Sequence, residues 1–170
     1  MEETLLMPLI RHLSENMKGV ELVDEDYGQL EMIDDENRDT YPLVFPSVLV
    51  DAPDTSWDNI KGLSQKGLAT VRVRLLVDCY DDTHASSGTV RRIEEREVLR
   101  RRLHSLVQGF RAESWTTGLV RVSSRFYTYN HGIKVYEASY TAEVTEMLRP
   151  DTAAIPGSSV RITIENGRMP

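Results

Sequence analysis

The stretch LATVRVRLLVDCY, residues 68–80, decides the fold. Apolar and other side chains alternate along it, which predicts a β-strand with one buried face. The inward set is Val71, Val73, Leu75, Val77 and Cys79, and the opposite set is Thr70, Arg72, Arg74, Leu76 and Asp78. In this register the Cys79 thiol points inward and is expected to be an inert core residue.

The same stretch runs into VDCYDDTH, residues 77–84, which gathers residue types that bind metals and activate water. A metal site would need Asp78, Asp81, Asp82 and His84 to converge on one point. Asp78 is expected to face away from Cys79, and the other three fall on a turn, where polar residues are the ordinary composition. We interpret the segment as the end of a strand and the start of a loop. A metal-dependent hydrolase stays as a remote alternative.

A long helix is predicted over about residues 89–108, with Ser86 or Ser87 as candidate caps and Gly109 as its stop. Its apolar stripe is Ile93, Leu99, Leu103, Leu106, Val107 and Phe110. Its charged residues are Arg91, Arg92, Arg96, Arg100, Arg101 and Arg102, against Glu94, Glu95 and Glu97. We interpret them as a solvated face with pairs such as Glu97 with Arg101 and Arg91 with Glu95. Sequence-specific DNA binding is not predicted, because the chain is acidic overall and no recognition motif frames the arginines.

The remaining segments complete an α+β pattern. Residues 5–17 predict a short amphipathic helix after a possible Thr4 cap, and residues 19–34 predict two short strands around a turn. A polar loop over 34–41 leads into the strand-like segment 43–53, whose Pro46 and Pro53 indicate an edge strand. Residues 54–67 are too rich in turn residues to predict regular structure. A hairpin follows, with Val120, Val122 and Phe126 on one face of its first strand.

The second strand of the hairpin carries Tyr136, Ala138, Tyr140, Ala142 and Val144, and the turn is NHG at 130–132. Another short strand is expected over 160–164. This order predicts a mainly antiparallel β-sheet with an N-terminal helix and one long helix packed on one face. We expect a single α+β domain over residues 1–146 and a C-terminal extension over 147–170 that serves as an interaction arm.

Composition and charge limit the classes of protein to which this chain can belong. With 170 residues, 40% hydrophobic and 28% charged, the chain is expected to be one globular domain. A lone cysteine, an acidic N-terminus unlike a signal peptide and the absence of a long apolar run favour a soluble protein in a reducing compartment, with no membrane partner. Residues 1–60 hold fifteen acidic and three basic residues, whereas residues 61–170 hold twelve and seventeen. This division suits copies that pack head to tail, acidic patch on basic.

Catalytic chemistry is not indicated by the other motifs. No Walker-type phosphate loop occurs, and SSGTVRR has one glycine before its helix. His12 and His104 lie on predicted helices without a ligand partner four residues on, and His131 lies in a hairpin turn. We predict that the chain is not an enzyme and has no catalytic residue, cofactor or metal.

The succession of an N-terminal helix, YPLVFPSVLVDAP, GLATVRVRLLVDCYDDTH, a helix ending LHSLVQGF and GLVRVSSRFYTYNHGIKVYEASYTAEV resembles tail terminator proteins of long-tailed bacteriophages and prophages. These are also called tail-completion or minor tail proteins. The resemblance covers about residues 1–146 and lies in the order and spacing of elements. The acidic segment 24–39 and the tail after Met147 look like additions to this plan, and either could grip a neighbouring copy.

The resemblance implies a structural role. Copies would form a ring, hexameric in that family, which caps the tail tube, stops its polymerisation and joins tail to head. Its partners would be the tail tube protein and head-tail connector proteins, in the host cytoplasm during assembly and then in the virion tail. The candidate interface or lumen residues are Arg72, Arg74, Arg91, Arg96, Arg100, Asp81 and Asp82. In the lumen, non-specific attraction to the phosphates of passing DNA would suffice. A non-viral interaction or assembly domain is the alternative.

Overall fold

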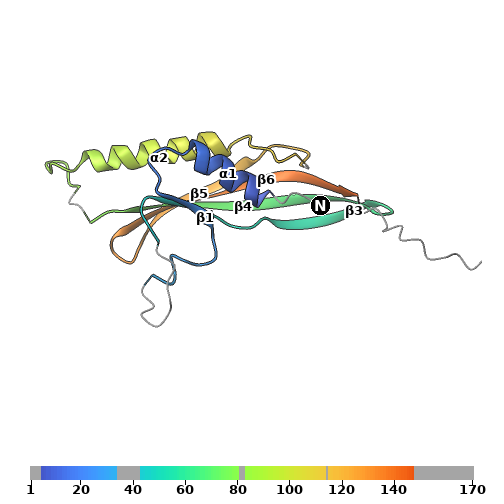
Figure 1. The fold of residues 1–170 in the computed structure, drawn as a ribbon, viewed down its shortest axis with the longest axis horizontal. Helices are drawn as coiled ribbons and strands as arrows, with labels where there is room; N and C mark the ends of the chain where they lie inside the picture. Colours follow the sequence, from blue (N-terminus) through green and yellow to red (C-terminus); the bar gives the residue numbers. More distant parts are fainter. Residues whose placement is uncertain (1–4, 34–42, 81–82, 114, 148–170) are drawn as a thin grey trace, which may run out of the picture.

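The computed structural model describes residues 5–33, 43–80, 83–113 and 115–147. Two helices and six strands follow one another along the chain (Figure 1). They are α1 (Leu6–Asn16), β1 (Leu22–Glu25), β2 (Ser47–Val50), β3 (Asp54–Lys61), β4 (Ser64–Asp78), α2 (Arg91–Val107), β5 (Val120–Tyr129) and β6 (Ile133–Met147). The predicted α+β class is therefore confirmed.

The strand predicted from residues 68–80 lies at the centre of the sheet. The strand order is β1-β2-β4-β6-β5, and β3 pairs with β4 beyond the end of β2. β4 and β6 pair antiparallel from Ser64↔Met147 to Asp78↔Ile133, and only the pairing of β1 with β2 is parallel. Two long strands side by side thus form the spine on which the other strands are placed.

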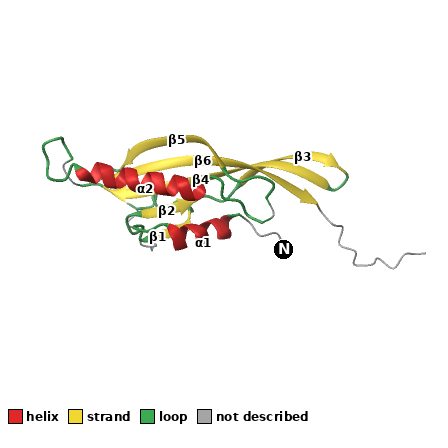
Figure 2. Cartoon of the chain, turned by 90° about the horizontal axis from the view of Figure 1, so that it is seen from above, coloured by secondary structure: helices red, strands yellow, loops and turns green. Residues whose placement is uncertain are grey.

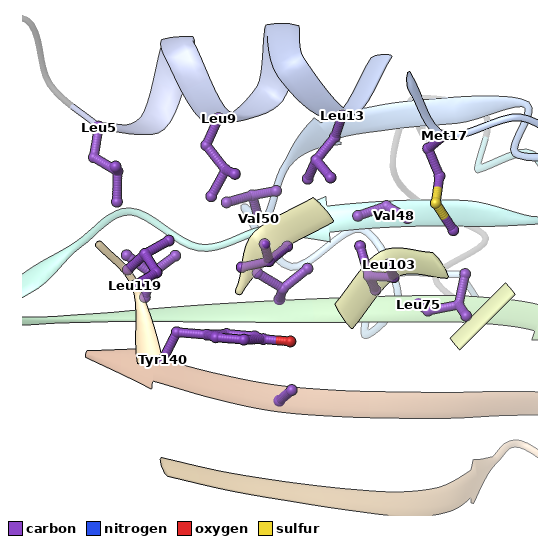
Figure 3. Close-up of a cluster of buried hydrophobic side chains, with 14 of the residues drawn as sticks. Leu5, Leu9, Leu13, Met17, Val48, Val50, Leu75, Leu103, Leu119 and Tyr140 are labelled. Carbon is purple, nitrogen blue, oxygen red and sulfur yellow. The ribbon is translucent and has the colours of Figure 1, made fainter. Parts of the chain in front are cut away.

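Both helices pack on one face of the sheet, as predicted (Figures 1 and 2). Leu5, Leu9 and Leu13 are fully buried. In Figure 3, Leu9 and Leu13 point from α1 toward Val50 and Val48 of β2, and Leu5, just before the helix, points toward Leu119. Of the predicted inward set, Val71, Val73 and Leu75 belong to the same cluster and Val77 packs against it, but Cys79 does not. The predicted residues of β6 from Tyr136 to Ala142 also belong to it, as do Leu103 and Val107 of α2. The core is therefore a layer between one face of the sheet, called the helix side below, and the two helices.

The opposite face of the sheet carries a second, smaller apolar cluster. It comprises Leu30, Leu49, Leu76, Ile133 and Val135, with Ile33, Leu43, Phe45, Tyr127 and Tyr129 packed against it. Leu30 comes from the segment after β1 and covers this part of the sheet. The rest of this second face carries polar side chains such as Thr70, Arg72 and Ser139, together with the exposed apolar Leu68.

The prediction that residues 54–67 lack regular structure is wrong. They form β3 and the first residues of β4, joined at Gly62, which has φ 61°. A Cβ on Gly67 would lie 2.7 Å from Thr55 Cγ2 and 2.8 Å from Trp57 Cε3, so glycine at this position lets the two strands pack closely. Pairing of β4 with β6 continues through this region and overrides the local turn propensity.

The prediction of an edge strand over residues 43–53 is also wrong. Pro46 and Pro53 lie outside β2, so all four of its residues keep their amides and β2 sits between β1 and β4. Of the two strands predicted over 19–34, only β1 forms. The following residues turn, with Gly28 at φ 94°, and residues 34–41 and Thr4 lie outside the described part of the chain.

Three details of packing differ from the predictions. Neither Ser86 nor Ser87 caps α2; Val90 occupies the cap without a side-chain hydrogen bond. The first half of the apolar stripe is open, because Ile93 is 42% exposed. On β5, Val120, Val122 and Phe126 are all exposed. They do not share one face as predicted, because a bulge between Arg121 and Ser123 places Val120 opposite Thr141 and Phe126 opposite Tyr136. The domain boundary at residue 146 is untested, and the strand at 160–164 and residues 148–170 lie outside the described residues.

Candidate functional site

A buried ion-pair cluster lies on the polar face of the sheet. Arg74 of β4 is 6% exposed, and its Nε and Nη2 donate to the Asp26 carboxylate at 2.6 and 2.5 Å. Its Nη1 donates to Glu31 Oε1 at 2.5 Å. The two acids come from the segment after β1, whose turn at Gly28 places them on either side of the guanidinium. Arg74 therefore fastens this segment to the sheet over the second apolar cluster.

Burial disfavours the charged form of Arg74, but the hydrogen bonds that it donates to Glu31 and Asp26 outweigh burial and raise the Arg74 pKa above its ordinary value. The same hydrogen bond from Arg74 lowers the pKa of Glu31. Arg74 and Glu31 are therefore charged near neutral pH. A compensated cluster of this kind stabilises a conformation and supplies neither a general base nor a free anion site.

Two further ion pairs border this cluster. Arg72 donates to Asp51, which raises the Arg72 pKa, and Arg125 of β5 donates to Glu137 Oε1 at 2.9 Å. Together with Arg74 they line an open cleft of about 380 Å³. Acidic and basic side chains alternate along its walls. Such a cleft resembles a solvent-exposed protein contact surface.

The arginines predicted as one interface or lumen lie on opposite faces. Arg72 and Arg74 lie on the polar face, whereas Arg91, Arg96 and Arg100 lie on α2 above the other face. Arg96 Nη1 donates to Cys79 Sγ at 3.1 Å, so Cys79 is half-buried at the end of β4 and not in the core as predicted. The predicted acids Asp81 and Asp82 lie outside the described residues.

The charged face of α2 forms pairs other than those predicted. Glu97 accepts from Arg100 at 2.8 Å, and Arg101 donates instead to the Glu97 carbonyl. The hydrogen bond to Arg100 lowers the pKa of Glu97. Glu95 pairs with Arg92, not with Arg91. These two ion pairs on α2 therefore have a spacing of three residues and not the expected four.

A polar cluster missed from the sequence lies between α2 and the sheet. His104 Nδ1 lies 3.1 Å from the hydroxyl of fully buried Tyr140, and Arg121 Nη1 donates to the Tyr136 hydroxyl at 3.1 Å. Burial raises the pKa of Tyr140. Burial, with repulsion from Arg121 and Arg100, lowers the pKa of His104, which therefore stays neutral. These hydrogen bonds satisfy polar groups at the margin of the core.

The metal-binding alternative gains no support from the described residues. Within residues 5–33, 43–80, 83–113 and 115–147, no group of three His, Cys, Asp or Glu side chains could hold a metal ion. Asp78 is exposed opposite Ile133, and His84 Nδ1 accepts from the Ser86 amide at 3.1 Å. Asp81 and Asp82, the other two proposed ligands, fall outside those ranges. In the same ranges, no helix is long and apolar enough to cross a bilayer.

Two exposed strand edges are the other candidate surface. β3 pairs only with β4 and β5 only with β6 among the described strands, so each keeps one edge of unpaired backbone groups. Large apolar side chains stay exposed along both, namely Trp57 and Ile60 on β3 and Val120, Val122 and Phe126 on β5. Such edges are templates for pairing with another chain. The sequence indicated β5 but not β3.

Comparisons with known proteins bear on the fold. No protein-family model and no curated protein matches the chain. A solved structure described as the virion of a native gene transfer agent particle contains a similar chain, with a TM-score of 0.55 and 10% sequence identity. The similarity covers 84% of this chain and 96% of that one. At this identity the likeness establishes a shared fold.

Proposed function

We propose that this chain is a structural protein of a phage-like particle and that its specific role is that of a tail terminator. Copies form a ring, six in the resembling family, on the last ring of the tail tube. The ring stops tube polymerisation and offers the surface that joins the head. Its partners are further copies of itself, the tail tube protein and head-tail connector proteins.

The fold likeness to a chain of a gene transfer agent virion carries this proposal. It extends over 96% of that chain, so nearly all of the neighbour's fold is shared. The order of elements that resembles tail terminators is the same order that builds the sheet and its two helices. A fold alone does not assign a function, so the surface chemistry has to agree as well.

The surface agrees with an assembly role. The charged groups around Arg74 form compensated pairs, and large apolar side chains remain exposed on β3 and β5. In the proposed ring, Arg72 and Arg125 on the polar face are candidates to line the lumen, where non-specific phosphate attraction to passing DNA suffices. Arg72 and Arg125 are exposed although each forms an ion pair, whereas Arg74 is buried against Asp26 and Glu31 and is not carried into this role.

The test adds the purified full-length chain to growing tubes of the tail tube protein from the same particle. We expect tubes to stop at a fixed length, with the chain at one end in negative-stain images. The control is another protein of similar size and net charge, which should leave tube length unchanged. Unimpeded growth in the presence of excess chain would sink the proposal.

The assembly-domain alternative is separated by gene neighbourhood. Capsid, tube and tape-measure genes beside this one would support a particle protein, and their absence together with unimpeded tube growth would favour a non-viral assembly domain. Assembly is expected in the host cytoplasm, followed by incorporation in the virion tail.

A further inference from the structure

The two exposed strand edges lie on opposite sides of the sheet. β6 takes one side of β4 along its whole length, so β3 occupies the other side, while β5 lies beyond β6. β3 has eight residues and β5 has ten. Figures 1 and 2 show β3 extending past the helices at one end of the molecule. One copy therefore offers two different edges of similar length, which is the requirement for a head-to-tail contact between copies.

The edges carry opposite charge. The acidic residues of β3 are Asp54 and Asp58, and Lys61 at its end is its only basic residue. β5 contains Arg121 and Arg125 and no acidic residue. The acidic β3 edge attracts a basic β5 edge and repels another β3 edge. This charge layout therefore favours β5 of a second copy as the partner of β3.

The strand directions set how such edges can meet. β3 and β6 each run antiparallel to β4, and β5 runs antiparallel to β6, so β3 and β5 run in opposite directions within one copy. Rotation about a ring axis preserves the direction of each strand relative to that axis. If the sheets continue from one copy to the next around a ring, β3 therefore meets β5 of its neighbour antiparallel.

We propose that β3 of one copy pairs antiparallel with β5 of the next, with Trp57 opposite Phe126 and Asp58 opposite Arg125. This inference deepens the proposed function and rests on its ring assembly. The exposed Trp57 and Phe126 form a cross-strand aromatic pair, and Asp58 reaches an arginine that is 66% exposed.

The faces of the two strands agree with this register. Trp57 is paired with Gly67, next to the inward Ala69 and Val71, and Phe126 is paired with the inward Tyr136, so both lie on the helix side. Asp58 and Arg125 are one residue along from them and lie on the polar side. A slip of one residue would place every side chain on the wrong face, so the register is specific.

Disulfide trapping tests the register. In a Cys79→Ser background, Asn59→Cys and Ser124→Cys are directly opposite and on the same face of the proposed pair. Their Cα separation across an antiparallel pair fits a disulfide. The control combines Asn59→Cys with Ser123→Cys, whose side chain points to the other face. We expect oxidised multimers on a non-reducing gel for the first pair and monomer for the control. Failure to cross-link at the highest soluble concentration, or equal cross-linking of both pairs, would overturn the proposal.

Charge exchange tests the same contact without cysteines. Asp58→Arg and Arg125→Glu each place like charges across the interface, so either variant alone should lose association in sedimentation velocity. An equal mixture of the two variants restores opposite charges at every contact of an alternating ring and should regain association. Circular dichroism of each variant checks that both fold. Association of either variant alone at the wild-type level, or no recovery in the mixture of folded variants, would contradict the register.

The outcomes separate this inference from the terminator role. A chain that forms the specific cross-link but does not stop tube growth keeps the interface and loses the proposed function. A chain that stops tube growth without the cross-link keeps the function and loses the interface.

Discussion

Arg74 illustrates how one side chain decides the conformation of a remote segment. Its guanidinium reaches Asp26 and Glu31, 48 and 43 residues away in the chain, and it is buried under the segment that carries them. Arg72, two residues earlier on the same face, makes one ion pair at the surface with Asp51. Two arginines that look equivalent in the sequence therefore contribute differently to the stability of the fold.

Arg74→Met should lower the free energy of unfolding by about 3 kcal/mol, because the carboxyl group of Asp26 is left buried without its partner. Arg72→Met should cost no more than ~1 kcal/mol, because its pair is partly solvated. Urea denaturation followed by circular dichroism measures both. Equal costs for the two variants would show that Asp26 relaxes into water when Arg74 is removed.

His104 is expected to make stability depend on pH. Its pKa in the folded chain is lowered from the ordinary 6.5 by burial and by Arg121 and Arg100. The unfolded chain therefore takes up a proton first, and the free energy of unfolding falls as the pH drops from about 6.5 toward the lower folded pKa.

His104→Gln should remove this contribution. As the pH is lowered below about 6.5, the wild type should then lose more unfolding free energy than the variant does. Urea titrations at a series of pH values measure it. Parallel stability curves for the two proteins would contradict the assignment.

Among the secondary-structure elements, the end of α2 depends on close backbone packing. Gly109 follows the helix at φ 81°, and its amide donates to the Leu119 carbonyl at 2.7 Å. Gly118 lies against it, so that an added Cβ would come within 2.6 Å of the Gly109 carbonyl oxygen. The two ends of the connection between α2 and β5 can thus pack this closely only because residue 118 lacks a side chain.

Gly118→Ala should therefore destabilise the protein by about 1–3 kcal/mol, since backbone and not a flexible side chain must move. Gly88→Ala is the matched control, because its Cβ would meet nothing within 4 Å. Thermal or urea unfolding compares the two. A loss no larger than that of the control would mean that the connection shifts freely.

For the whole molecule, the charge layout follows the order of strands. The acidic first third of the chain supplies α1, β1, β2 and β3, and the more basic remainder supplies α2 and β5. Because β3 and β5 lie on opposite sides of the sheet, the division seen along the sequence becomes a division across the molecule.

Association between copies should therefore weaken as salt rises above about 0.15 M, since the Debye length falls below the spacing of exposed charges. Sedimentation velocity across a salt series measures this. If association is insensitive to salt, apolar contacts such as that of Trp57 with Phe126 dominate the interface.

The sequence by itself determined the element types of most of the domain. Alternation along β4 and β6 and the spacing of Leu5, Leu9 and Leu13 are local patterns, so the inward faces of these elements could be read without knowing their partners. The turn at 130–132 and the side on which the helices pack followed from the same patterns. The site was only partly predictable: Arg72, Arg74 and Arg96 were named, but not the groups that they contact.

Only the tertiary structure decided the rest. β3 forms because β4 continues past the reach of β2 and offers an edge, which no local propensity records. Asp26 and Glu31 meet Arg74, and Arg96 meets Cys79, because strand register and chain reversal bring distant residues together. The opposite placement of the acidic β3 and the basic β5 likewise depends on strand order. Side-chain period is a local property of the chain, whereas strand order and register depend on contacts between segments far apart in it.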